Sequence, residues 1–187
     1  MIRRRFASDE GMTLIELVVA SMLGLLILTI AGGFIINGLR GQHSVSNLTD
    51  ATNTGQLTAT AIQTDIRNAS AIKVVPGTNQ FVTARVARGG STSVSWKCVA
   101  WFYSATAKEI RFKTSSAAIT SPSTEQFKTW SLIADGISPV GGQVFAGDIS
   151  HLNMTFSVDA GTSDPVVISS SAYSRNPSGE PDICFTP

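Results

Sequence analysis

The chain has little charge for its length. Only 14% of its 187 residues are Asp, Glu, Lys or Arg, compared with about a quarter in ordinary soluble domains. Ser and Thr supply much of the polar character instead, and the formal net charge is +1. A total so close to zero gives no reason to expect nucleic acid or an acidic substrate as a partner.

Cysteine is also scarce. The chain has two cysteines, Cys98 and Cys184, with no C-x-x-C and no His near either in sequence, which argues against a redox motif or a zinc site. In an oxidising compartment the two would pair and close a loop of more than eighty residues. Such a bond stabilises by about 4 kcal/mol in the chain-entropy model. Two buried, reduced thiols are the alternative.

Catalytic motifs are missing as well. The sequence contains no P-loop, H-E-x-x-H, G-x-S-x-G or dinucleotide fingerprint. His43 lies just beyond an apolar run, and His151 alternates with the polar Asn153 and Thr155. Both histidines are expected to be solvated. We therefore expect no enzymatic activity and no cofactor.

The strongest positive signal is an apolar run near the N-terminus. No charged residue occurs from Leu17 to Leu39, and 23 helical residues reach about 35 Å, enough to cross a bilayer core. Arg3, Arg4 and Arg5 precede the run and Arg40 follows it. The positive-inside rule predicts a single membrane pass with the basic leader in the cytoplasm and the remainder outside.

Two ordinary explanations of this run are incomplete. A cleaved secretory signal has an apolar region of about 7 to 15 residues and a small-residue cleavage site, whereas here the small cluster at 31–33 lies in the middle of the run. A plain membrane anchor explains the length but leaves Glu16 unexplained. An acid in such a segment is costly and usually functional.

The residues that begin the run resemble the processing signal of type IV prepilins and of the pseudopilins of type II secretion. That signal is a short basic leader ending in glycine, one hydrophobic residue, Thr-Leu-Ile-Glu-Leu and a long apolar helix. The corresponding positions here are Gly11, Met12, Thr13, Leu14, Ile15, Glu16 and Leu17. Phe is the usual first mature residue in the family, so Met12 departs from the pattern while staying apolar. The close resemblance covers residues 11–39, and the rest is similar only in general architecture.

The resemblance implies a life cycle for the subunit. A prepilin peptidase would cut between Gly11 and Met12 and methylate the new amino group of Met12. The subunit would lie in the lipid of the bacterial cytoplasmic membrane with its head outside. At an inner-membrane assembly platform it would then join other pilin subunits, through its N-terminal helix, in an extracytoplasmic filament. The long head with many short strands, without a compact cysteine-bounded C-terminal loop, is more similar to a minor pilin or a larger pseudopilin than to a major pilin. We expect a minor pilin. The alternatives are a type II secretion pseudopilin, or a membrane-anchored binding module, for example for DNA uptake, that does not polymerise.

Glu16 has a specific expected role in assembly. It lies four residues after Met12, so its carboxylate would pair with the new positive amine of Met12 in an adjacent subunit. At about 4 Å and an effective dielectric of about 20, such a pair gains on the order of 4 kcal/mol before desolvation. The alternative is an unpaired acid that reaches the headgroups.

The helical pattern continues beyond the apolar run. Apolar or small residues recur every seven positions, with others between them, at Leu48, Gly55, Ala59, Ile62, Ile66 and Ala69. This stripe predicts an amphipathic continuation over residues 40–72 that ends near Ala71, before Pro76 and Gly77. Together with the leader (1–11) and the membrane or filament-core helix (12–39), it precedes a β-rich head (73–187).

Within the head the period changes to two. Val94, Trp96, Cys98, Ala100 and Phe102 alternate with Ser95, Lys97, Val99, Trp101 and Tyr103. This alternation predicts a strand, a turn at 104–108 and a second strand with Ile110 and Phe112, with the basic side outward. A second alternation over 152–158 predicts another hairpin, with its turn at 159–165 and its return strand at 166–173. The fold class is therefore α+β, a long N-terminal helix packed on an antiparallel sheet of four or more strands.

Two ligand hypotheses remain for the head. The loop from Asp159 to Asp164 has two acids and a glycine, so the two aspartates are a weak calcium candidate, or else part of an ordinary hairpin turn. The basic hairpin from Arg85 to Lys113 carries Trp96, Trp101 and Tyr103. It would suit single-stranded DNA, or it is simply a half-buried sheet.

Overall fold

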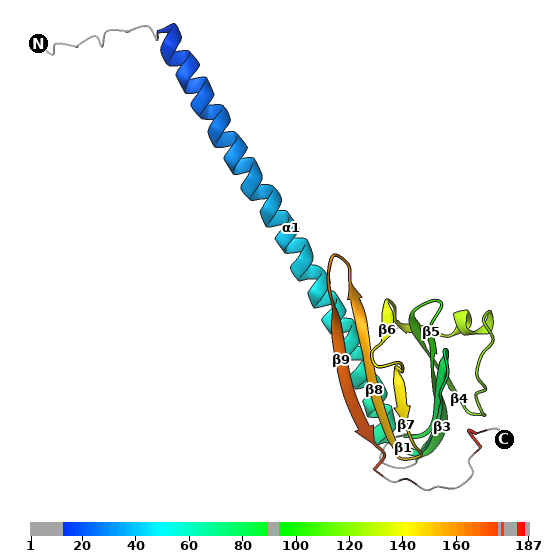
Figure 1. Cartoon of the computed structure of the whole chain (residues 1–187). Coiled ribbons are helices and arrows are strands. Elements are labelled where there is room, and N and C mark those ends of the chain that lie inside the picture. The colour runs from blue at the N-terminus through cyan, green and yellow to red at the C-terminus, as the bar shows by residue number, and fades with distance from the viewer. Residues whose placement is uncertain (1–12, 90–93, 176, 178–182, 186–187) are drawn as a thin grey trace, which may run out of the picture. The chain divides into compact units, whose positions relative to one another are not determined.

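One long helix and a β-rich head make up the chain (Figure 1). The computed structural model describes residues 13–89, 94–175, 177 and 183–185. Helix α1 spans Leu14–Arg67. The chain divides into two compact units, one ending at His43 and the other beginning at Ser44. Each is described by itself, and the head below means the unit that begins at Ser44.

The head contains two antiparallel sheets. The first sheet has the order β1-β2-β3-β4-β5, and in the second β6 and β7 pair with one side of β8 while β9 also pairs with β8. A short 3-10 helix, η1, precedes β5. The elements are β1 (Ala69–Val75), β2 (Gln80–Arg88), β3 (Ser95–Ser104), β4 (Glu109–Ser115), η1 (Gln126–Thr129), β5 (Ser131–Ala134), β6 (Ile137–Pro139), β7 (Phe145–Gly147), β8 (His151–Ala160) and β9 (Ser163–Tyr173). The predicted α+β class, a long helix on an antiparallel sheet, is confirmed, although there are two sheets.

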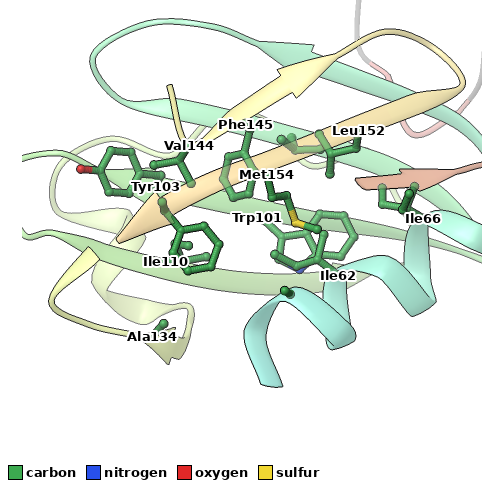
Figure 2. Packing of buried hydrophobic residues seen from close by; sticks show 14 of the residues in the cluster. Ile62, Ile66, Trp101, Tyr103, Ile110, Ala134, Val144, Phe145, Leu152 and Met154 are labelled. Carbon is green, nitrogen blue, oxygen red and sulfur yellow. The ribbon is translucent and has the colours of Figure 1, made fainter. Parts of the chain in front are cut away.

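Within the head, the part of α1 from Ser44 onward packs on the two sheets through the predicted stripe. Gly55, Ala59, Ile62 and Ile66 are all buried, whereas Leu48 at the start of the stripe is exposed. Figure 2 shows Ile62 and Ile66 of α1 facing Trp101 of β3 and the β7–β8 side chains Phe145, Leu152 and Met154. This main core fills the space between the helix and the inner faces of both sheets, and burial of its apolar side chains stabilises the head.

A second apolar cluster covers the opposite face of β3. Cys98, Ala100 and Phe102 of β3 pack with Ile119, Phe127, Trp130 and Cys184. Cys98 and Cys184 are joined by a disulfide with a Cα–Cα distance of 5.3 Å. Cys184 is thereby held against the central strand, which is buried on both faces.

The helix ends earlier than predicted. It stops at Arg67, and residues 69–72 are buried in β1, paired with β2. The side-chain amide of Asn68 donates to the Thr64 carbonyl (3.0 Å) and so satisfies one of the last helical acceptors. Ala69 is buried as predicted, but as a strand residue. Residues 69–72 form a strand that pairs with β2, although their apolar spacing would also fit a continued helix.

The prediction that the hairpin turns its basic side outward is wrong in most respects. Trp101 and Tyr103, on the same face of β3 as Lys97, are 1% and 2% exposed and belong to the main core. Arg111 of β4 lies on the opposite face, where its Nη1 donates to the carbonyls of Lys128 (3.1 Å) and Trp130 (2.9 Å). Both faces are covered because the segment of η1 and Trp130 folds over the outer face of the sheet.

The β8–β9 hairpin is confirmed with a tighter turn. Ala160 pairs with Ser163, so only Gly161 and Thr162 connect the strands. Gly161 has a φ of +65°, which a glycine adopts without steric cost. Pro165 therefore lies inside β9 rather than in the turn, at a position that an edge strand tolerates.

Candidate functional site

The predicted processing site lies at the beginning of α1. Gly11 and Met12 fall outside the described residues, and Thr13 is the first residue with a described position. Thr13 caps the helix, because its carbonyl accepts from the amides of Glu16 (3.0 Å) and Leu17 (3.2 Å) and its Oγ1 accepts from the Glu16 amide (3.4 Å). The helix thus begins directly after the predicted cut.

Glu16 occupies the third helical position, three residues after the capping threonine. This T-x-x-E spacing is the capping-box pattern, in which the acid also stabilises the helix start, and an acid in the first turn is favoured by the helix dipole. The Glu16 side chain is exposed, and its carboxylate has no hydrogen-bond or ion-pair partner in the described part of the chain. The threonine half of the capping box is therefore formed among the described residues, whereas the glutamate half is not seen there. The T-x-x-E spacing is visible in the sequence, but a capping box was not among the expectations drawn from it.

The apolar half of α1 is exposed on all sides within the described subunit. Leu14 is 83% exposed and Phe34 is 74% exposed, and every large apolar side chain between them is at least 43% exposed. Two hydroxyl side chains in this half bond to their own helix: Ser21 Oγ donates to the Val18 carbonyl (2.9 Å) and Thr29 Oγ1 to the Leu25 carbonyl (2.8 Å). By length and composition the helix can cross a membrane.

Glycines in this half of the helix are not required by packing within the subunit. A Cβ built at any of the five would meet nothing within 4 Å, at positions Gly24, Gly32, Gly33, Gly38 and Gly41. Each costs up to about 1 kcal/mol of helix stability relative to Ala. Their advantage must come from outside the subunit, and small residues permit close approach of another helix.

The calcium candidates belong to an ordinary turn. Asp159 Oδ1 accepts from the Gly161 amide at 2.8 Å, which is the local role of an Asp in a tight turn. Asp50, Asp135 and Asp159 line one cleft of about 340 Å³, and Asp164 is not among its lining residues. Among the residues with described positions, no three His, Cys, Asp or Glu side chains are grouped closely enough to hold a metal ion.

Two of the three aromatic residues proposed to bind DNA are buried in the core of the head. Trp101 and Tyr103 are inside the main core, where they cannot stack on bases. Trp96 remains partly exposed, with the Arg85 guanidinium 4.1 Å from its ring centroid. His151 stacks on Tyr173 with a centroid separation of 4.3 Å. Of the three aromatic side chains proposed to bind DNA, Trp96 is therefore the one that remains accessible to a ligand.

No protein-family model, no curated protein and no solved structure matches the chain. What can be inferred of its function depends on the residues described above.

Proposed function

We propose that the chain is a structural subunit of a type IV pilus-like filament, of the minor-pilin kind. In this proposal prepilin peptidase cuts after Gly11, and Met12 becomes the methylated N-terminus. The observation that carries the proposal is the start of α1, where a capped turn leads into a helix that is apolar on every side. Within residues 13–89, 94–175, 177 and 183–185, the Glu16 carboxylate in this turn has no hydrogen-bond or ion-pair partner. That combination supports assembly better than simple anchoring.

The apolar surface needs a covering in every state of the subunit. A helix that is hydrophobic all round is stable only in lipid or among other apolar elements. Lipid of the cytoplasmic membrane covers it first in this proposal, and the helices of neighbouring subunits cover it in the filament. The five glycines allow those helices to approach closely.

The orientation follows from the charges and the disulfide. Arg3, Arg4 and Arg5 keep the leader in the cytoplasm by the positive-inside rule. The head then lies outside, where the Cys98–Cys184 bond is expected to persist. The inner-membrane assembly platform is the partner that would move the subunit from lipid into the filament.

Glu16 is the group that sets the register. The amine of Met12 does not exist until the leader is removed, so the pair between Glu16 and the Met12 of a neighbour forms only after processing. Docking of the pair compensates the cost of an acid among apolar residues.

The alternatives differ in what happens after processing. A type II secretion pseudopilin would share the cut and the pairing, but within a secretion apparatus. A membrane-anchored binding module would share the helix without polymerising. DNA uptake is the less favoured use of such a module, because Trp101 and Tyr103 are buried.

Two substitutions at one position test the proposal. Glu16→Ala removes both the charge and a side chain able to cap the helix, whereas Glu16→Gln keeps a side chain able to cap and removes only the charge. Both variants are expected to be cut after Gly11 and inserted into the membrane, and both should enter filaments at least about tenfold less, the effect of losing about 1.4 kcal/mol of docking. Mass spectrometry of the N-terminus and immunodetection in sheared filaments provide the measurements.

Normal incorporation of Glu16→Ala would refute the filament proposal and favour the anchored module. Normal incorporation of Glu16→Gln alone would assign Glu16 to helix capping instead of charge pairing. A mature N-terminus other than methylated Met12 would refute the proposed cleavage after Gly11 and the methylation of Met12.

A further inference from the structure

Strand β9 forms an edge of the second sheet. It is eleven residues long (Ser163–Tyr173) and pairs with β8 on one side, with no strand on its other side in the described part of the chain. The pairing runs without irregularity from the Val158–Val166 pair to the His151–Tyr173 pair. The outward edge is therefore straight over this length.

The ladder shows which backbone groups face outward. Ser174 N donates to the Ser150 carbonyl (2.8 Å), one step beyond the His151–Tyr173 pair. Hydrogen-bonded pairs recur every second residue in an antiparallel ladder. Even-numbered residues of β9 from Val166 onward thus point their N–H and C=O at β8, and odd-numbered residues point theirs at the free edge.

Contacts with α1 agree with this assignment and define where the free edge ends. Gln63 Nε2 donates to the Ser171 carbonyl (3.1 Å), and Arg175 N donates to the Arg67 carbonyl (3.3 Å). Ser171 of β9 and Arg175, which lies just after the strand, are both odd-numbered. The helix therefore satisfies part of the edge at its C-terminal end.

Between these contacts and the turn, the edge is open. The N–H and C=O of Val167 and of Ser169, and the N–H of Ser171, have no hydrogen-bond partner among residues whose positions are described. Natural edge strands are usually protected by lysine, proline or a bulge. The part of β9 from Val166 to Tyr173 has no charged residue and no proline. Pro165 lies in β9 immediately before this part.

We propose that the free edge of β9, from Val167 to Ser171, binds an extended, uncharged peptide segment of another protein, which adds to the second sheet as a further strand. Main-chain hydrogen bonds supply the affinity in this mode of recognition. Val167 and Tyr173 are 58% and 64% exposed on the outer face, so β-branched or aromatic residues of the incoming segment would pack beside them. The inference does not depend on the filament proposal.

A proline at position 169 tests the edge without breaking the sheet. Ser169→Pro removes an N–H that points away from β8, so the β8–β9 ladder stays intact. Ser169→Ala keeps the N–H and is the matched control. The probe is a fluorescein-labelled peptide with the sequence KKTVTVTVKK, titrated by anisotropy against the full chain in detergent micelles.

The wild type and Ser169→Ala are expected to bind the peptide with equal affinity. Ser169→Pro should bind about tenfold more weakly, as expected for losing one main-chain hydrogen bond of about 1.4 kcal/mol. Absence of binding to the wild type, or equal binding by the Pro and Ala variants, would overturn the proposal. Concentration-dependent dimerisation of the wild type that Ser169→Pro abolishes, without peptide binding, would assign the edge to a second copy instead.

A peptide variant keeps the test decisive if Ser169→Pro does not fold. N-methylation of alternate residues in the probe blocks one of its two hydrogen-bonding edges. Methylation in one phase should abolish binding and methylation in the other phase should preserve it. Equal effects of both phases would contradict strand addition.

Discussion

Gly55 of α1 and Ile168 of β9 lie in direct contact across the helix–sheet interface. A Cβ placed on Gly55 would be 2.5 Å from Ile168 Cγ1 and 3.1 Å from Val158 Cγ2. This glycine therefore lets the helix approach β8 and β9 closely, unlike the five glycines of the apolar half of α1.

The contact predicts the effect of one methyl group. Gly55→Ala should lower the free energy of unfolding of the head by about 1–3 kcal/mol, because overpacking costs more than the roughly 1 kcal/mol of helix propensity that alanine adds. Chemical denaturation of the full chain in micelles measures it. Gly41→Ala is the matched control and should be neutral or slightly stabilising, since nothing lies near its added Cβ. A Gly55→Ala head as stable as the wild type would show that Ile168 moves aside.

Replacement of the buried Gln80 should lower the free energy of unfolding of the head. Its side chain is 1% exposed, and Oε1 accepts from the amides of Val144 (3.0 Å) and Phe145 (2.8 Å), so that it ties β2 to the start of β7. Gln80→Met keeps the shape and leaves two buried amides unpaired, at about 1–3 kcal/mol each. We expect a lower midpoint of denaturation and faster amide exchange at both residues. The same change at the exposed Gln56 should do nothing.

The ionisation of Asp65 should make the head less stable as pH rises, which is the opposite of the effect of most carboxylates in folded proteins. Burial raises the pKa of Asp65, and the Arg88 guanidinium, 2.6 Å away, lowers this pKa only in part. Because the pKa is higher in the folded state than in the unfolded state, the contribution of Asp65 to stability is present at low pH and lost as pH rises through the folded pKa.

The measurement is the unfolding free energy as a function of pH in three proteins. Asp65→Asn should remove this contribution, so that its stability relative to the wild type increases as pH rises from the acid range to neutrality. Arg88→Met removes the partner and should make the loss with rising pH steeper. Parallel pH profiles for all three would refute the assignment. The pKa of Asp148 is shifted in the opposite direction to that of Asp65, because hydrogen bonds from the amide and hydroxyl of Ser150 lower the pKa of Asp148.

Removal of the disulfide should destabilise the apolar cluster on the outer face of β3. Cys98→Ser with Cys184→Ser should lower the free energy of unfolding by about 2–4 kcal/mol and expose the cluster that contains Phe127 and Trp130. Tryptophan emission and protease sensitivity near the C-terminus report it. Reductant should reproduce the change in the wild type and have no further effect on the double variant. Unchanged emission after reduction would mean that the cluster is stable without the bond.

Periodicity made the main elements predictable. The burial of Ile62 and Ile66, the β3–β4 hairpin and the alternation of Leu152, Met154 and Phe156 in β8 all follow from which side chains share a face. Each of these patterns is local, because it depends on the geometry of one helix or one strand.

Covering elements and boundaries were less predictable. The sequence places Trp101 and Tyr103 on the outer side of a strand, because the residues that cover the other face follow no regular pattern. They lie far along the chain, from Ile119 to Cys184. The end of α1 at Arg67 was missed because pairing of residues 69–75 with β2 is a tertiary gain that helical spacing does not contain. At the candidate site, the sequence was sufficient to place Glu16 but not to decide whether it caps, pairs or does both.

The sequence by itself determined an apolar helix with an acid in its first turn, a β-rich head and two cysteines able to pair, because local spacing and hydrophobicity carry that information. Only the tertiary structure decided that β3 is buried on both faces, that Gly55 admits Ile168, and that β9 pairs on one side alone among the described strands. These features depend on which distant segments meet, and a pattern within one element does not specify its neighbours.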